Sequence, residues 1–557
     1  MRKTLNDLLD ETGDRFPNHG ALSFFGKTTT YRKFIDKVDQ FSAFLKSRGL
    51  RHGDRVLLLL PNCPQMDIAC WGIWKAGCVM VALNPLLKSE ELMAMAQLVS
   101  PKMFITLKDV KEFDEHNQVI ISCIGKDCQV VMTGMEDTLP LPLSIFYPLT
   151  TLLYRLKRKE KLPPHSSWRS IKLSPKERAK YNNGEIPGPD SFAVLQFTGG
   201  TTGSMKAAAL THANLVANVG QAMDLVGNVL NEDSVVFSAI PCFHVYGLSV
   251  CLVLAVSRGA KVVMIPRFMD KKKVIKNGKE VTVARINKEV LRVFKKERIT
   301  LIPGIPNIFA AIIDDTRFRN FSIDSLRLCV SGSGALAPEV KERFEGWAGC
   351  EIIEGYGLSE TSPIVSINPP GRAIPGSLGM PVRDTEIKIV PEPDAKPEDG
   401  GELWVRGPQV MWGYWENPQA TAEVLTGDGW LKTGDMVRRE GEYLVMTDRK
   451  KDMIKVSGEN VYPSEIEKIL LDKLGVAEVY VVGIPDDKTG ERVVACVVLR
   501  DGEPPCDLVY IREACKELSK IKIPKQVRCF SKDEIPRTYL GKVQKKELRK
   551  LFSPGPA

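Results

Sequence analysis

The chain has 557 residues, 43% of them hydrophobic and 26% charged, with a net charge of +9. Such a composition is that of a globular protein, and the length is too great for one ordinary core, so we expect several subdomains. Thirteen cysteines occur without a Cys-x-x-Cys pair, and six histidines are scattered, which excludes a disulfide framework and a zinc site and favours the reducing cytoplasm.

Short apolar runs alternate with amphipathic stretches in the first part of the chain. The predicted strands are 21–25, 56–60 and 78–82, and the predicted helices are 1–10, 34–45 and 66–76. The same alternation resumes at 192–197, 261–265, 300–312 and 326–330. Alternating strands and helices predict the α/β class, with helices on the faces of a sheet.

Residues 136–190 interrupt this alternation as an insertion. From Pro148 onwards, Leu149, Leu152, Leu153 and Leu156 fall on one helical face, and a basic run, residues 155–159, follows. The pattern leaves two interpretations open, a helix on an anionic membrane surface or a segment packed on the protein's own body. Nucleic acid is not the predicted partner, because the basic runs lack interleaved stacking aromatics.

The longest uncharged stretch, Ser234–Ser257, has the length of a membrane span. Pro241, His244 and Gly247 interrupt it, so we predict a strand, a loop and a buried helix instead. Further on, residues 370–435 are rich in Gly, Pro and charge and predict a small β-rich subdomain. A dense charge run at 447–452 places a domain boundary between 1–447 and 448–557.

The most informative stretch is Thr198-Gly-Gly-Thr-Thr-Gly-Ser-Met-Lys206, which leaves an apolar strand. A Gly/Thr-rich turn in this position can direct backbone N–H groups and hydroxyls at one phosphate, and Lys206 adds a cation. The spacing does not match the G-x-x-x-x-G-K-[ST] loop.

Six further motifs follow in order. They are Pro241-Cys-Phe-His-Val-Tyr-Gly247, Ser331-Gly-Ser-Gly-Ala-Leu-Ala-Pro338, Tyr356-Gly-Leu-Ser-Glu-Thr361, Lys432-Thr-Gly-Asp435 and the run from Asp448 to Glu467, with Ile535-Pro-Arg-Thr-Tyr-Leu-Gly-Lys-Val543 near the end. Together with the loop at 198–206, this series resembles the adenylate-forming superfamily of acyl- and aryl-CoA synthetases. The resemblance implies a large N-terminal domain of α/β subdomains with a small β-rich subdomain, and a small mobile α+β C-terminal domain.

The resemblance also implies a reaction with ATP, Mg²⁺ and coenzyme A. A carboxylate attacks the α-phosphate of ATP to give an acyl-adenylate and pyrophosphate, and a thiol then attacks that mixed anhydride. The implied catalytic residues are Lys542, Glu360, Thr201 and His244, and the implied metal ligands are Glu360 and Thr201. The implied ATP-binding residues are Thr198, Gly199, Gly200, Thr201, Thr202, Gly203, Lys206, Gly334, Tyr356, Gly357, Ser359, Asp435 and Arg449.

The resemblance gives the remaining motif residues more specific roles. Lys542 would bind the substrate carboxylate and the α-phosphate, and Asp435 would accept hydrogen bonds from the ribose hydroxyls. Lys451 would be the hinge of the C-terminal domain, and Gly458 would let the pantetheine arm of CoA pass. Ala207 departs from the family, which usually has Gly there; the methyl group is costly only if φ is positive. His244 has two interpretations, a gate near the acyl pocket or a histidine bonded to backbone.

The motif details and the insertion most resemble bacterial long-chain fatty acid–CoA ligases, so fatty acid is the predicted substrate. Phe243, Val245, Ile305, Ile308 and Leu336 either line an alkyl channel or pack in the core. A ligase for a medium-chain, aryl or dicarboxylic acid, a loader of carrier proteins, a non-catalytic acyl- or nucleotide-binding relative and a membrane-associated structural protein are the alternatives. A homodimer and a peripheral position on the cytoplasmic membrane face are further expectations.

Overall fold

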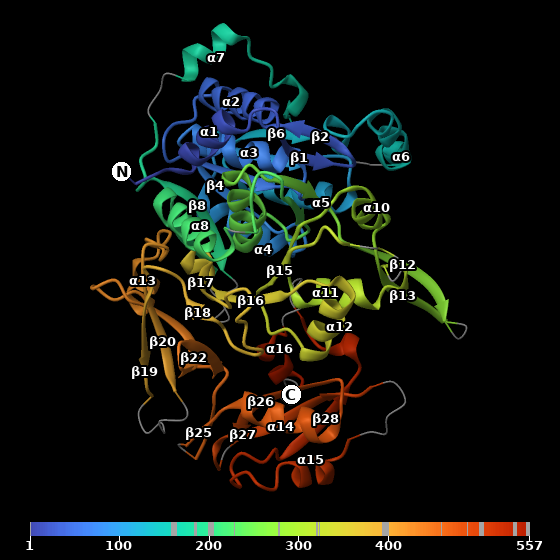
Figure 1. The fold of residues 1–557 in the computed structure, drawn as a ribbon, viewed down its shortest axis with the longest axis vertical. Coiled ribbons are helices and arrows are strands. Elements are labelled where there is room, and N and C mark those ends of the chain that lie inside the picture. Colours follow the sequence, from blue (N-terminus) through green and yellow to red (C-terminus); the bar gives the residue numbers. More distant parts are fainter. Residues whose placement is uncertain are drawn as a thin grey trace. The chain divides into compact units, whose positions relative to one another are not determined.

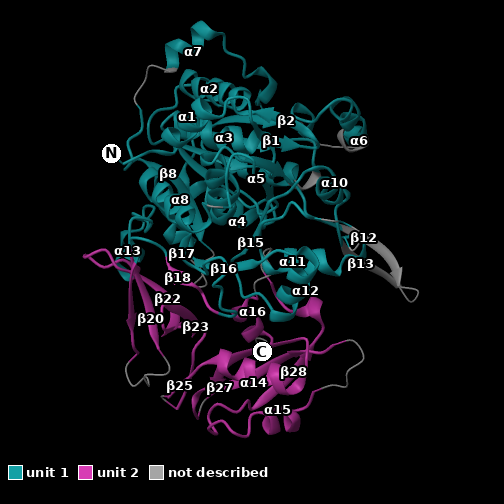
Figure 2. Cartoon of the chain, in the orientation of Figure 1, with its two compact units in different colours: residues 1–376, 382–385, 407–423 teal, residues 377–381, 386–406, 424–557 magenta. Residues whose placement is uncertain are grey.

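The computed structural model describes residues 2–157, 164–182, 186–198, 205–227, 229–276, 279–318, 321, 323–392, 400–457, 459–486, 488–500, 506–537 and 543–552. The chain divides into two compact units, coloured teal and magenta in Figure 2. Unit 1 comprises residues 1–376, 382–385 and 407–423, and unit 2 comprises residues 377–381, 386–406 and 424–557.

The first large sheet of unit 1 is mostly parallel (Figure 1). Its strands, in spatial order, are β17 (Ile364–Ile367), β16 (Ile352–Gly357), β15 (Leu328–Ser331), β14 (Leu301–Gly304), β10 (Val235–Ser238), β11 (Lys261–Met264), β1 (Gly20–Phe24) and β2 (Lys27–Thr30). The pairs from β16 to β1 are parallel, while β17 and β2 join antiparallel. Every residue of β10, β14 and β15 is buried, as expected for parallel strands that helices cover on both faces.

The second large sheet of unit 1 carries the strand before the Gly/Thr-rich turn. In spatial order its strands are β21 (Gly413–Tyr414), β9 (Lys206–Thr211), β8 (Phe192–Thr198), β4 (Val79–Ala82), β3 (Arg55–Leu59), β5 (Met103–Leu107), β6 (Gln129–Thr133) and β7 (Ser166–Ser167). Neighbours from β8 to β7 are parallel, whereas β9 runs antiparallel to both β8 and β21.

Helices alternate with these strands along the chain. They are α1 (Leu5–Arg15), α2 (Tyr31–Ser47), α3 (Pro64–Lys75), α4 (Ser89–Val99), α5 (Lys111–Cys123), α6 (Leu143–Lys157), α7 (Pro175–Asn182), α8 (His212–Val226), α9 (Ala255–Ser257), α10 (Lys288–Lys296), α11 (Pro306–Asp314), α12 (Pro338–Ala348) and α13 (Pro418–Val424). Local sequence explains several starts: Thr4 and Asp7 form a capping box for α1, and α3, α11 and α12 begin with proline, which needs no N–H there. A hairpin of β12 (Met269–Lys276) and β13 (Lys279–Ile286) follows β11. The predicted α/β class is confirmed.

Unit 2 contains two antiparallel sheets joined in sequence. The first is β19 (Glu386–Val390), β20 (Gly401–Arg406), β22 (Leu431–Glu440) and β23 (Tyr443–Arg449), and the second is β25 (Glu459–Val461), β24 (Ile454–Val456), β27 (Gly490–Val498) and β26 (Glu478–Asp486), with β28 (Gln526–Phe530) parallel to β27. Its helices are α14 (Pro463–Leu474), α15 (Leu508–Ala514) and α16 (Lys545–Lys550). The boundary predicted after residue 447 lies within β23, three residues before the turn that separates the sheets, and it stays a prediction.

The long uncharged stretch folds as predicted, into a strand, a loop and a buried helical segment. β10 is followed by a π-helix, Gly247–Leu254, and then by α9, and all residues of the π-helix are buried. In the part of the chain that the structure describes, no helix combines the length and the apolar character needed to cross a bilayer.

Helix α6 differs from its prediction at one end. It begins at Leu143, so Pro148 lies inside the helix and not at its start. The first turn is anchored by the Ser144 N–H, which donates to the Pro140 carbonyl at 2.9 Å, and by the Ile145 N–H, which donates to the Pro142 carbonyl at 3.0 Å. Because proline lacks an N–H, Pro148 cannot donate a helical hydrogen bond to the Ser144 carbonyl.

Candidate active site

Three motif segments lie at one edge of the first sheet. The segment with His244 follows β10, the small-residue loop follows β15, and Tyr356 lies at the end of β16. Strands β10, β14, β15 and β16 are mutually parallel, so their carboxyl ends face the same edge. In open α/β sheets, ligands bind outside the carboxyl ends of the strands, which makes this edge the candidate site.

Buried hydrogen bonds hold these segments together. The Tyr246 hydroxyl donates to the Val330 carbonyl on β15 at 2.9 Å. The Gln196 amide on β8 donates to the Phe243 carbonyl at 3.1 Å. The strand that leads into the Gly/Thr-rich turn is therefore tied to the His244 segment, and that segment to the strand before the small-residue loop.

The small-residue loop has two different kinds of glycine. A Cβ added at Gly332 would lie 3.1 Å from the Tyr246 ring, so glycine is favoured there by packing. A Cβ at Gly334 would meet nothing nearer than Pro306, at 3.9 Å, so packing does not explain that glycine. At the end of the loop the Leu336 N–H donates to the Glu354 carboxylate at 3.3 Å, and burial raises the pKa of Glu354.

The Tyr356–Thr361 motif is shaped by close backbone contacts. A Cβ at Gly357 would lie only 1.7 Å from the Pro363 carbonyl, so glycine is required there for packing whatever its role toward ATP. Tyr356 is half-buried on β16, and Ser359 opens a 3₁₀ turn that continues to Thr361. The Thr361 hydroxyl accepts from the Leu358 N–H at 3.0 Å, which fixes the turn that carries Glu360.

The structure brings Glu360 and Lys206 to one side chain, Tyr414. The Tyr414 hydroxyl donates to Glu360 Oε1 at 2.8 Å, and Lys206 Nζ lies 5.2 Å from the centroid of the Tyr414 ring. Lys206 Nζ also lies 3.8 Å from the carboxylate of Glu423. Burial, and secondarily Glu360, raise the pKa of Tyr414, so its hydroxyl stays protonated and remains a donor.

Sequence reasoning missed Tyr414 as a site residue. Tyr414 was assigned no role from the sequence. The backbone explains its position: the Trp415 N–H donates to the Ala207 carbonyl at 2.8 Å, and β21 pairs with β9 directly after Lys206. No local signal in the sequence indicates this pairing, because more than 200 residues separate the two strands.

Ala207 is harmless in this fold. It is buried on β9 opposite Phe197, and it is absent from the left-handed region that would favour glycine. The substitution of the family's usual glycine therefore causes no backbone strain here.

His244 is half-buried, and its Nδ1 accepts from the Tyr246 N–H at 3.2 Å. In a neutral ring this places the proton on Nε2. The backbone-bonded interpretation is thus present in the structure, and the gating role stays a prediction. Phe243, Val245, Ile305, Ile308 and Leu336 are all buried, and the alkyl channel stays a prediction.

Thr198 ends β8 and Lys206 begins β9, so these antiparallel strands bring both ends of the predicted phosphate loop together. The residues between them, Gly199, Gly200, Thr201, Thr202 and Gly203, lie outside the described residues.

Unit 2 contains the Lys432–Asp435 motif in the hairpin of β22 and β23. Asp435 is buried and lies opposite Arg449, whose Nε is 3.3 Å from Asp435 Oδ1. The Thr433 hydroxyl accepts from the Asp435 N–H at 3.1 Å and donates to the Leu403 carbonyl at 2.7 Å. Gly434 has a φ of +71°, a conformation that favours glycine. Asp435 and Arg449, predicted separately to face ATP, are therefore brought together.

Lys451 is exposed in the turn between the two sheets of unit 2. On one side of it, Asp448 is buried and fixed: Oδ1 accepts from the Arg449 N–H at 2.7 Å and Oδ2 from the Ser464 N–H at 3.0 Å, in the first turn of α14. On the other side, β24 begins at Ile454. A short exposed turn between two anchored elements is a suitable place for a hinge.

Gly458 and Lys542 lie outside the described residues, but the neighbours of Lys542 are ordered. Arg537 and Val543 form an antiparallel bridge, and the Gln544 N–H donates to the Pro536 carbonyl at 2.8 Å. Lys545 then pairs with the mostly buried Glu467 on α14 at 2.7 Å, and burial raises the pKa of Glu467.

The residues at this site suit an Mg²⁺ ion that binds together with ATP. No cluster of three or more His, Cys, Asp and Glu side chains that could hold a metal occurs among the described residues. Glu360 supplies one hard carboxylate, whose Oε1 accepts a hydrogen bond from the Tyr414 hydroxyl. Mg²⁺ is commonly held by one or two carboxylates together with substrate phosphates, which is consistent with this arrangement.

Comparison with known proteins identifies the family of the chain. Residues 9–415 match the AMP-binding enzyme family, and residues 465–542 match the AMP-binding enzyme C-terminal domain. The long-chain-fatty-acid–CoA ligase of Bacillus subtilis (strain 168) is 35% identical over 551 residues, covering 98% of this chain and 94% of that protein. The indoleacetate–CoA ligase of Aromatoleum aromaticum is 30% identical over 556 residues, covering 99% and 98%.

The fold agrees as well. The crystal structure of ATP-bound MatB from Rhodopseudomonas palustris superposes with a TM-score of 0.79 at 24% identity and covers 99% of both chains. The resemblance, with its large N-terminal and small C-terminal domain, is thus confirmed across nearly the whole chain. The chain therefore belongs to the AMP-binding enzyme family and is a ligase of the adenylate-forming kind.

Proposed function

We propose that the chain is a long-chain fatty acid–CoA ligase that works through an acyl-adenylate. The observation that carries the reaction is the meeting of Lys206 and Glu360 on Tyr414, because it joins the predicted phosphate loop to the predicted metal ligand. The substrate class rests on the full-length similarity to the Bacillus subtilis ligase.

In the first step, a carboxylate oxygen of the fatty acid attacks the α-phosphorus of ATP. The bond from that phosphorus to the bridging oxygen breaks, and pyrophosphate leaves with the bonding electrons. Lys206 and the loop 198–204 would hold the β- and γ-phosphates, Asp435 and Arg449 would hold the ribose, and Tyr356 would face adenine. Lys542 would stabilise the negative charge that builds up between carboxylate and α-phosphate.

Mg²⁺ would neutralise charge on the phosphate oxygens when it is bound with ATP. Glu360 and Thr201 are the residues proposed to hold it. Tyr414 fixes the orientation of the Glu360 carboxylate and, as a protonated phenol, adds no charge of its own.

In the second step, the CoA sulfur attacks the carbonyl carbon of the acyl-adenylate. The thiol loses its proton, AMP leaves with the carboxyl oxygen, and a thioester remains. We assign Lys451 to the pivot between the two steps and Gly458 to the passage of pantetheine. His244 would border the acyl group.

A second candidate is a ligase for an aryl or medium-chain acid. The similarity to an indoleacetate–CoA ligase favours it, although the identity is lower. Loading of a carrier protein in place of CoA is the third candidate.

The setting of the enzyme also stays a proposal. A long-chain acid partitions into bilayers, so a cytoplasmic enzyme that takes it gains from a peripheral position at an anionic membrane face. The predicted homodimer rests on the sequence alone.

Pyrophosphate release with ATP and Mg²⁺ across a panel of acids, each with and without CoA, tests the proposal. Release with C12–C18 acids and formation of acyl-CoA is the expected result. Release with indoleacetate or short acids in preference would favour the second candidate, and release that ends at acyl-adenylate would favour a carrier protein. No release with any acid would contradict the ligase assignment.

A further inference from the structure

Helix α6 presents an apolar surface to solvent. Of the fifteen large hydrophobic side chains exposed in the described part of the chain, seven lie between residues 141 and 156. The others are spread over distant segments. Those of this one segment are Leu141, Leu143, Ile145, Phe146, Leu149, Leu152 and Leu156, and we refer to them as the α6 apolar face. A contiguous exposed apolar patch of this kind marks an interaction site.

An ordinary surface helix turns its apolar side chains toward the protein, whereas α6 turns them toward solvent. Within α6, at 100° per residue, Ile145, Leu149, Leu152 and Leu156 fall within one sector about 60° wide. Leu143 and Phe146 lie outside this sector and are also exposed, whereas Ser144, Tyr147, Pro148 and Thr151 are partly covered by the protein. An apolar sector that points outward is not explained by packing against the body of unit 1.

The exposure is high at both ends of the α6 apolar face. The side chain of Leu141, just before the helix, is 74% exposed and that of Leu156, near its end, is 73% exposed. In Figure 1, α6 lies at the margin of the fold, to the side of β1 and β2.

The charge along the segment has one sign. No Asp or Glu occurs from residue 138 to residue 159, whereas Arg155, Lys157, Arg158 and Lys159 follow one another at its end. An apolar face with basic residues and no acidic ones complements an anionic lipid surface, in which apolar side chains enter the headgroup boundary and cations meet phosphates.

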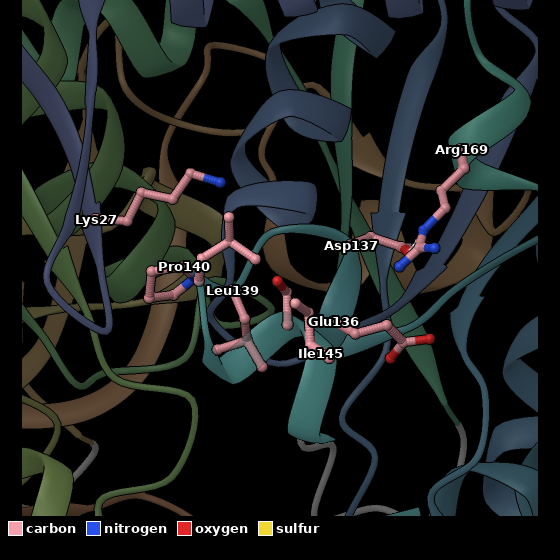
Figure 3. A pocket seen from close by; sticks show the side chains of 9 residues that line it. Lys27, Glu136, Asp137, Leu139, Pro140, Ile145 and Arg169 are labelled. Carbon is pink, nitrogen blue, oxygen red and sulfur yellow. Dashed lines mark hydrogen bonds and ion pairs between the residues drawn. The ribbon is translucent and has the colours of Figure 1, made fainter. Parts of the chain in front are cut away.

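A surface hollow adjoins the first turn of α6 (Figure 3). It has a volume of about 610 Å³, and Leu139, Pro140, Leu141 and Ile145 line it together with two basic residues, Lys27 and Arg169, and two acidic ones, Glu136 and Asp137. Leu141 and Ile145 belong to both the hollow and the α6 apolar face, so the apolar surface continues beyond the helix. The Lys27 amine donates to the Thr138 carbonyl at 3.5 Å, which places a second cation beside this surface.

We propose that the α6 apolar face docks the enzyme on an anionic bilayer, with α6 lying in the plane of the interface. The proposal rests on the proposed function only for its purpose, the supply of a membrane-dissolved acid. The docking itself follows from α6 alone and is tested without any substrate.

The test is flotation of the full chain with vesicles, without ATP, acid or CoA. Vesicles of phosphatidylcholine are compared with vesicles containing one part phosphatidylglycerol to three parts phosphatidylcholine. The expected result is binding to the anionic vesicles that is at least tenfold stronger than to the neutral ones and that weakens as salt is added.

Two variants separate the apolar and the charged contributions. Leu149→Glu combined with Leu156→Glu should lower binding at least tenfold, and Arg155→Glu combined with Lys157→Glu should remove the preference for anionic vesicles. Leu86→Glu is the matched control, because Leu86 is 72% exposed and lies outside the α6 apolar face. Unchanged thermal midpoints would verify that all variants fold, since the leucines are exposed.

Three outcomes would overturn the proposal. The wild-type chain fails to float with either vesicle, the leucine variant floats as well as the wild type, or Leu86→Glu is equally impaired. Sedimentation velocity tests whether the face binds a second copy of the chain instead. If the wild type is a dimer that does not bind vesicles, and the leucine variant is a monomer, the face belongs to the dimer interface. Because no substrate is present, failure here leaves the ligase assay unaffected, and failure of the ligase assay leaves flotation unaffected.

Discussion

At the scale of the residue, the candidate site depends on a few side chains whose position the fold dictates. Glu360 is held by Tyr414, Asp435 by Arg449, and the His244 ring by the Tyr246 N–H. Glu360, Asp435, Arg449 and His244 lie inside recognisable motifs and were named from the sequence. Tyr414 lies outside those motifs and was missed. The two glycines with packing roles, Gly332 and Gly357, are explained by contacts that would exist without any ligand.

Tyr414→Phe tests the joint role of Glu360 and Lys206. The change removes the hydroxyl that donates to Glu360 and keeps the ring below Lys206. Hydrogen bonds to charged groups are worth about 1.5–3 kcal/mol, so we expect ATP–pyrophosphate exchange to fall roughly tenfold to a hundredfold and to need more Mg²⁺. Exchange rates measured over a magnesium series check this. Exposed Tyr510→Phe is the control, and an unaltered magnesium dependence of Tyr414→Phe would contradict the assignment.

At the scale of the element, the structure ties helices and turns into place through buried polar contacts. The Leu5 N–H of α1 donates to His212 Nδ1 at the start of α8, at 3.3 Å. Asp448 joins β23 to α14, and the turn with Lys451 follows at once. These contacts join α1 to α8 and β23 to α14, and the proposed hinge lies in the turn at 450–453.

We expect the contact between α1 and α8 to be sensitive to acid, because it depends on the neutral form of His212. Burial lowers the pKa of His212 to about 4, below the ordinary value of 6.5 that applies in the unfolded chain. The unfolded state therefore takes up the proton first, so the stabilisation by neutral His212 is complete above pH 6.5 and is lost as the pH falls toward 4, on the order of 3 kcal/mol in all. His212→Gln should flatten urea-unfolding free energies across this window. Exposed His19→Gln should keep the wild-type slope, and an equal slope for His212→Gln would refute the contact's role.

Lys451→Pro tests the hinge. Proline fixes φ near −65°, so the turn would lose part of its range while the anchored elements on either side are unchanged. We expect adenylate formation to persist and transfer to CoA to slow at least tenfold, measured by single-turnover assays of each step. Lys455→Pro would be a poor control because Lys455 lies in β24; Lys451→Ala, which keeps a free φ, is the matched one. Normal CoA transfer by Lys451→Pro would exclude the hinge.

At the scale of the whole molecule, the proposed chemistry needs residues from both compact units. Glu360, Lys206 and Tyr414 belong to unit 1, whereas Asp435, Arg449 and Lys542 belong to unit 2. Two half-reactions in one chain are then separable by mutation, because each requires a different part of unit 2.

Lys542→Ala should separate the two half-reactions in the direction opposite to Lys451→Pro. Without the ammonium, charge on the attacking carboxylate and α-phosphate is not stabilised, so adenylate formation should fall at least a hundredfold. Transfer from supplied acyl-adenylate to CoA should continue at close to the wild-type rate. Both rates are measured on the same preparation, and an equal loss of both steps would contradict the role of Lys542.

The sequence by itself determined the fold class and the alternation of strands and helices, because parallel strands are continuous apolar runs. It also proposed most of the candidate site residues, because the motifs that contain them are short and local. It also predicted correctly that residues 234–257 form a strand, a loop and a buried helical segment, because Pro241, His244 and Gly247 interrupt the stretch.

Only the tertiary structure decided which distant residues meet. The pairing of β21 with β9 places Tyr414 between Lys206 and Glu360, and the hairpin of β22 and β23 places Arg449 beside Asp435. Pairing across a sheet depends on long-range packing, which no local pattern encodes. For the same reason the sequence recognised the apolar stripe of α6 but left its direction open: a helical face reads identically whether it points inward or outward, and only the surrounding fold turns it to solvent.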